Sequence, residues 1–305
     1  MCRHGVLWSI ATTLVMGWPA LARADVGVRV APGELGTAWS FDPLVLFSLT
    51  LAGWLYSCGL AQLRARTGAV RAVGPMHAAC YYASLGLIAL ALLSPLDALS
   101  QELSAAHMVQ HMLLIVVAAP LFVLGSPALI FAYAMPPLWR QLLGLQWLAH
   151  KATWHPLVVW CFFAATLWSW HHPLLYQAAL RDPLVHDAQH LSFFVAAFLF
   201  WRIVLDPLSR RRLHAAVATP YLFATSLHAS ALGIFLTLAT APWYADYLER
   251  TAAFGFTPLA DQQLAGLIMW VPACLIYPLI AMALLVRWLA DSLEDANSSR
   301  EGCLS

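Results

Sequence analysis

Two segments of the chain repeat one histidine pattern. Residues 107–111 read His-Met-Val-Gln-His, and residues 186–190 read His-Asp-Ala-Gln-His. Histidines four residues apart lie on one face of an α-helix, about 6 Å apart along its axis. His171 and His172 end a third apolar segment. Imidazole is the commonest metal ligand, so the spacing predicts that three helices bring metal-binding rings to one level.

The donor set around these histidines favours copper. Met108 and Met112 flank the first pair, Met269 lies in the last apolar segment, and thioether sulfur suits Cu(I). Gln110, Gln189 and Asp187 are placed to orient imidazole rings through hydrogen bonds. We therefore expect a copper site whose ligands come from six histidines: His107, His111, His171, His172, His186 and His190. Met108, Met112 and Asp187 are lower-ranked candidates.

Other interpretations of these residues stay open. A single histidine at headgroup depth is commonly only solvated, and a methionine in an apolar helix commonly only packs. His77 and His228 could be functional or simply packed. Two facing imidazoles also suit haem, as in a membrane oxidoreductase. A membrane metal transporter would need polar groups continuing through the bilayer, where the sequence offers mainly His228 and Thr225.

Familiar enzyme motifs are missing from the sequence. It holds no Glu-x-x-His pair, no Gly-x-Ser-x-Gly, no P-loop and no dinucleotide fingerprint. Its six cysteines form no C-x-x-C pair, so we expect no disulfide framework. We expect a protein that captures and hands over a metal and is not an enzyme.

The composition places these histidines in a lipid bilayer. Of 305 residues, 61% are hydrophobic and 10% are charged, whereas soluble domains carry about 25% charged residues. The net charge of +1 gives no sign of a nucleic-acid partner. We expect an all-α bundle of seven transmembrane helices, since seven stretches are long and apolar enough to span: 43–62, 76–94, 106–125, 156–172, 187–206, 216–240 and 263–289.

The amino terminus and the basic residues predict one orientation. Residues 1–24 resemble a secretory signal ending in Ala22-Arg23-Ala24. Residue 25 would then lie outside, and Lys and Arg gather on the connections that would be cytoplasmic. This predicts a periplasmic segment 25–42, a membrane domain 43–289 and a cytoplasmic tail 290–305. Leu138 to Ala149 is expected to form an amphipathic helix on the inner surface.

Three segments resemble the signature of the CtaG-type cytochrome c oxidase assembly factors. They are HMVQHMLLIVVAAPLFVLGSP at 107–127, WHHPLLYQAALRDPLVHDAQHLSFFVAAFLFW at 170–201, and DQQLAGLIMWVP at 261–272. The family usually has two adjacent glycines in the third motif, where this chain has Ala265 before Gly266. The third motif adds Asp261 and Met269 as second-rank candidates.

The resemblance covers roughly residues 40–290 and implies a fold and a role. Members are seven-span proteins of the bacterial plasma (inner) membrane that help to mature haem–copper oxidase. The resemblance implies delivery of copper to a cytochrome c oxidase subunit, with a periplasmic copper donor as a second partner.

Overall fold

The computed structural model describes residues 29–67, 73–135, 141, 155–209 and 212–304. All regular elements in these ranges are helical, which agrees with the predicted all-α class. The predicted signal over 1–24 lies outside the described residues. So does the amphipathic helix expected over 138–149, apart from Gln141.

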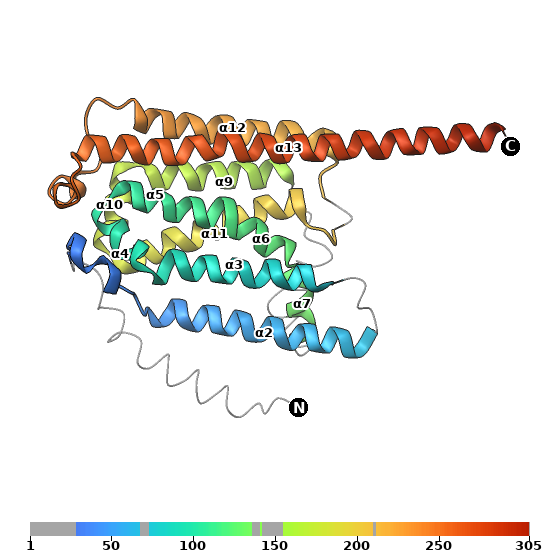
Figure 1. Cartoon of the computed structure of the whole chain (residues 1–305), viewed down its shortest axis with the longest axis horizontal. Coiled ribbons are helices and arrows are strands. Elements are labelled where there is room, and N and C mark those ends of the chain that lie inside the picture. Colours follow the sequence, from blue (N-terminus) through green and yellow to red (C-terminus); the bar gives the residue numbers. More distant parts are fainter. Residues whose placement is uncertain (1–28, 68–72, 136–140, 142–154, 210–211, 305) are drawn as a thin grey trace.

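Long helices run side by side along one direction, and short helices join them (Figure 1). Proline stands at the first helical position of most of them, because its missing N–H is one that a helix start leaves unbonded. The α-helices are α2 (Pro43–Thr67), α3 (Pro75–Leu93), α4 (Pro95–Glu102), α5 (Ser104–Met112), α6 (Ala119–Leu124), α7 (Pro127–Ala134), α9 (Pro156–His171), α10 (Pro173–Arg181), α11 (Pro183–Leu205), α12 (Ala215–Thr237) and α13 (Pro258–Leu304). Short 3₁₀ turns are η1 (Pro32–Thr37), η4 (Ala245–Tyr247) and η5 (Thr251–Phe254).

Helices α5 and α6 form one continuous span through a π-helical segment, η2 (Leu113–Ala118). A π turn leaves backbone carbonyls out of the ordinary ladder. One of them, at Ile115, accepts a hydrogen bond of 2.8 Å from the indole Nε1 of Trp201 on α11. The span ends as predicted at Gly125-Ser126-Pro127, where Ser126 has a left-handed φ of 51° and α7 begins.

Five helices are long and apolar enough to cross a membrane: Pro43–Ala65, Pro75–Leu93, Ser104–Leu124, Pro183–Leu205 and Pro258–Leu293. They coincide with five of the seven predicted spans. The other two predicted spans correspond to α9, which has 16 residues, and α12, which includes Pro220 and His228. Both lie alongside the five (Figure 1). Seven spans and the orientation of the termini stay predictions.

Helix α13 is longer than the predicted span 263–289. It has 47 residues and continues through the expected tail to Leu304, projecting beyond the other helices (Figure 1). Its first half packs closely on α12 through two glycines. A Cβ on Gly266 would lie 2.6 Å from the Gly233 carbonyl oxygen, and one on Gly233 would lie 2.7 Å from the Trp270 Cβ. Small residues allow this close approach of two membrane helices.

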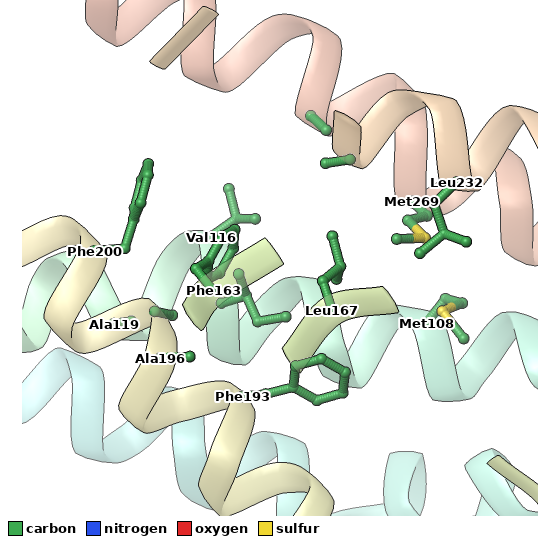
Figure 2. Packing of buried hydrophobic residues seen from close by; sticks show 14 of the residues in the cluster. Met108, Val116, Ala119, Phe163, Leu167, Phe193, Ala196, Phe200, Leu232 and Met269 are labelled. Atoms are coloured by element: carbon green, nitrogen blue, oxygen red, sulfur yellow. The ribbon is translucent and has the colours of Figure 1, made fainter. Parts of the chain in front are cut away.

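An apolar core fills the space between α5, α9, α11, α12 and α13. Phe163 and Leu167 from α9 meet Phe193 from α11, while Met108 and Met269 enter from α5 and α13 (Figure 2). These side chains are almost completely buried. The packed core fixes the rotation of each helix and therefore the direction in which its histidines point.

Candidate metal centre

Five histidine rings converge inside one end of the bundle. His107 and His111 come from the first turns of α5, His171 from the last residue of α9, and His186 and His190 from the start of α11. All five are buried. The ring centroids are 4.4 Å apart for His107 and His111, 4.2 Å for His186 and His190, and 5.4 Å for His107 and His186. The two predicted i,i+4 pairs therefore face each other.

Three of these side chains form the closest group. His107, His186 and His190 each offer one ring nitrogen such that the three nitrogens lie within 4.8 Å of one another. His111 adjoins this group, with its ring centroid 5.4 Å from that of His190. His171 lies one step further, at 6.0 Å from His111. We call the first three the histidine triad and all five the histidine cluster.

Several buried ring nitrogens of the cluster lack hydrogen-bond partners within the described part of the chain. They include Nε2 of His186, His190 and His171 and both nitrogens of His111. A buried polar atom without a partner costs about 1–3 kcal/mol, so such atoms are rare unless a ligand completes them. Several unpartnered imidazole nitrogens around one point fit a transition metal ion. The nitrogen-only set suits copper, zinc, iron or nickel.

Asp261 fixes the start of α5 from a distant helix. The residue that precedes α5, Leu103, has no side-chain acceptor for the first amides of the helix. The carboxylate of Asp261 on α13 accepts from the Ser104 amide at 2.7 Å, the Ser104 hydroxyl at 2.7 Å and the Ala105 amide at 3.1 Å. It is fully buried. Asp261 thus fixes where α5 begins, and with it the position of His107, which lies one helical turn after Ser104. Both carboxylate oxygens of Asp261 are used in these hydrogen bonds to α5.

A glutamine and a tyrosine hold the His107 ring. Its Nε2 lies 3.1 Å from Oε1 of Gln189, and its Nδ1 lies 3.5 Å from the Tyr247 hydroxyl. The same hydroxyl donates to the Ser100 carbonyl at 2.8 Å. Burial raises the pKa of Tyr247 well above its usual range, so the phenol remains a neutral donor. Gln189 is therefore placed to orient a histidine ring through a hydrogen bond, as its position in the motif predicts.

Two further tyrosines line the cluster and were missed by the sequence reasoning. The ring of Tyr176 on α10 lies 5.0 Å from that of His107 and stacks on Tyr244 at 3.9 Å. The Tyr244 hydroxyl donates to the His171 carbonyl at 3.1 Å. Tyr244 and Tyr247 both lie in the connection between α12 and α13. Their only sequence signal is an aromatic-rich loop, which is typical of any membrane interface.

Other predicted site residues lie apart from the triad. His172 is exposed, and its Nδ1 accepts from the Leu174 amide at the start of α10. Met108 and Met269 belong to the apolar core, and Met112 packs against it. Gln110 donates to the Ala91 carbonyl and to Asp97 instead of orienting a ring. Asp187 is half-buried and faces a neighbouring cavity.

Two single histidines lie away from the cluster. The ring of His228 on α12 contacts Trp160 and Phe163, at 5.1 and 6.2 Å, and its nitrogens have no partner among the described residues. His77 lies in the first turn of α3.

The fold and the cluster define a class of protein: a helical membrane protein with a buried, nitrogen-rich centre able to hold a metal ion. The model of the cytochrome c oxidase caa3 assembly factor family, Caa3_CtaG, matches residues 54–291. The chain belongs to this family, which confirms the resemblance carried by the three motifs.

Curated relatives are longer than this chain. Uncharacterized proteins of Mycobacterium bovis and Mycobacterium tuberculosis are each 27% identical to it over 266 residues, covering 83% of this chain and 39% of theirs. One of Mycobacterium leprae is 25% identical over 271 residues, covering 83% and 40%. The chain thus spans less than half the length of these relatives. No solved structure matches the chain.

Proposed function

We propose that the chain is a membrane copper donor that helps to assemble a cytochrome c oxidase. The histidine triad captures the ion, and the protein passes it to an oxidase subunit without turning over a substrate. The observation that carries this proposal is the convergence of His107, His186 and His190 inside a member of an oxidase assembly family, where Nε2 of both His186 and His190 has no hydrogen-bond partner among the described residues.

The arrangement of the cluster suits capture followed by release. Neutral imidazole binds copper firmly, and copper can exchange one imidazole for another without leaving the cluster. His111 is close enough for such an exchange, since its ring lies 4.4 Å from His107 and 5.4 Å from His190. The apolar shell of Met108, Phe193 and neighbouring residues excludes water, which strengthens binding of the ion to the nitrogens.

The proposed topology places the cluster at the periplasmic face. In this arrangement α9 and α12 also span the bilayer, giving seven spans in the bacterial inner membrane. The amino terminus lies outside after removal of the signal, and the basic connections lie inside. A periplasmic copper carrier would then supply the cluster.

The test combines metal analysis with a genetic assay. Purified wild-type protein should bind Cu(I), whereas His186→Ala and His190→Ala should lose it while keeping their helical content. His172→Ala is the matched control, because this ring lies outside the cluster. Cells that lack the gene, or that carry His190→Ala, should contain oxidase with lowered copper content. Fully metallated oxidase in the deletion strain would refute the assembly role.

Two alternative functions make different predictions. A haem-binding oxidoreductase would show a Soret band after purification, whereas a Cu(I) site leaves the visible spectrum nearly bare. A transporter would need polar groups beyond the cluster. The described residues there are mainly apolar, as Figure 2 shows for Phe163, Leu167 and Phe193, which favours a donor. Copper uptake into proteoliposomes would favour the transporter.

A further inference from the structure

A cavity of about 680 Å³ opens beside the histidine cluster. It lies between the first halves of α2 and α11, with α3 and α4 at its base. Helix α2 packs against α3 and α7, whereas α11 packs against α6, α9 and α10, so α2 and α11 leave this space between them. The cavity extends from Ser40 and Gln101 at the end of the bundle to Ala52, Leu85 and Phe122 deeper in it.

The cavity reaches the histidine triad from one side only. Of the five clustered histidines, His186 and His190 line it. These two are also the most accessible members of the cluster, at 9% and 5% exposed, against 0% for His107 and 1% for His111. Their Nε2 atoms have no hydrogen-bond partner within the described ranges. The His107 ring, which does not line the cavity, contacts Tyr176 and Tyr247 instead.

Two carboxylates border the same cavity. Asp187 follows His186 on α11, and Asp42 lies across the cavity at the start of α2. Asp42 also caps α2, since its Oδ1 accepts from the Leu44 and Val45 amides at 2.7 and 3.0 Å. Neither carboxylate forms an ion pair with a basic side chain in the part of the chain that the structure describes. A cation in the cavity would be attracted by both carboxylates. Carboxylate oxygen is a poor ligand for Cu(I), so it would attract the ion without trapping it.

The geometry points to this cavity as the access route of the metal to the histidine triad. We infer that the ion enters between α2 and α11, passes Asp42 and Asp187, and binds first to His186 and His190 before His107 completes its shell. The remainder of the cavity is lined mainly by apolar side chains such as Leu49, Leu85 and Phe194. This inference rests on the proposed function, since it assigns a route to the same site.

The test is the rate at which Cu(I), supplied under reducing conditions, loads the purified metal-free full chain. Ala188→Trp would fill the mouth of the cavity, because Ala188 is an exposed lining residue. We expect it to slow loading at least tenfold while the final copper content stays at the wild-type level. Asp187→Asn removes one carboxylate and should slow loading several-fold, with a weaker dependence on salt concentration.

Two control variants change similar residues elsewhere. Ala165→Trp adds the same side chain at an exposed position of α9, and Glu249→Gln removes an exposed carboxylate from the α12–α13 connection. Neither position lines the cavity, so both should load at the wild-type rate. Wild-type loading rates in both Ala188→Trp and Asp187→Asn would overturn the access route while leaving the metal site intact. A wild-type protein that takes up no copper would instead overturn the proposed function.

Discussion

Replacing Asp261 with alanine should destabilise the bundle through the start of α5. The change leaves the Ser104 and Ala105 amides and the Ser104 hydroxyl without their acceptor in a fully buried place. Each buried donor that loses its partner costs about 1–3 kcal/mol, and the hydroxyl can rotate to another acceptor. The expected loss of unfolding free energy is therefore about 3–5 kcal/mol. At roughly 2 °C per kcal/mol, the unfolding temperature should fall by about 6–10 °C.

Thermal unfolding of the purified protein in detergent, followed by far-ultraviolet circular dichroism, measures this loss. The matched control is Asp182→Ala. Asp182 accepts from the Leu184 and Val185 amides at the start of α11, but it is exposed, so water can replace it. An exposed cap is worth about 1 kcal/mol. Asp261→Asn keeps one carbonyl acceptor and should lie between the two. Equal losses for Asp261→Ala and Asp182→Ala would refute the buried-cap reasoning.

Three further predictions concern the surroundings of the site. Gln189→Leu should weaken copper affinity about 10- to 100-fold in a competition with a Cu(I) chelator, because it releases the His107 ring. Gln110→Leu should keep the wild-type affinity, because the Gln110 amide donates to Ala91 and Asp97 and to no histidine. Equal affinities in the two variants would contradict the role of Gln189 in orienting His107. Tyr247→Phe should lower the free energy of unfolding by about 1 kcal/mol, because the hydrogen bond to the Ser100 carbonyl is lost, and it should retain the copper content. An unchanged unfolding temperature would count against that hydrogen bond. Gly233→Leu should force α12 and α13 apart and lower the yield of folded protein. Gly86→Leu should not lower the yield, because no atom lies within 4 Å of a Cβ added at Gly86. Equal yields of the two variants would show that α12 and α13 tolerate separation.

The histidine pairing was predictable from the sequence because helical periodicity is strict. Four-residue spacing puts His107 with His111, and His186 with His190, on one helix face regardless of the rest of the fold. The predicted alternation of the spans also places the starts of the two histidine-bearing helices, α5 and α11, at the same end of the bundle. That the two faces meet depends on packing of the apolar core, which single-sequence patterns do not specify.

Other site residues were predictable in position but not in role. Asp261 belongs to a recognisable motif at the start of the last span, yet its partners lie on α5, 156 and 157 positions earlier in the chain. A long-range contact of this kind leaves no local periodicity. Tyr176, Tyr244 and Tyr247 look like ordinary interfacial aromatics in the sequence. His171 and His172 were both predicted as ligands, and only His171 joins the cluster, because which of the two points inward depends on where α9 ends.

Whether the thioethers of Met108 and Met269 face a metal depends on the rotation of their helices, which their positions in the sequence do not specify. Met108 is adjacent to His107 in sequence, but successive residues on a helix point about 100° apart. The structure places both Met108 and Met269 in the apolar core (Figure 2), and a role as metal ligands stays a prediction.

X-ray absorption spectroscopy of the copper-loaded full chain tests the central claim most directly. The account predicts a first coordination shell of imidazole nitrogen without sulfur, which becomes incomplete in His190→Ala and is unchanged in His172→Ala. A shell that contains thioether or thiolate sulfur, or one that is identical in wild type and His190→Ala, would contradict the histidine triad as the metal site.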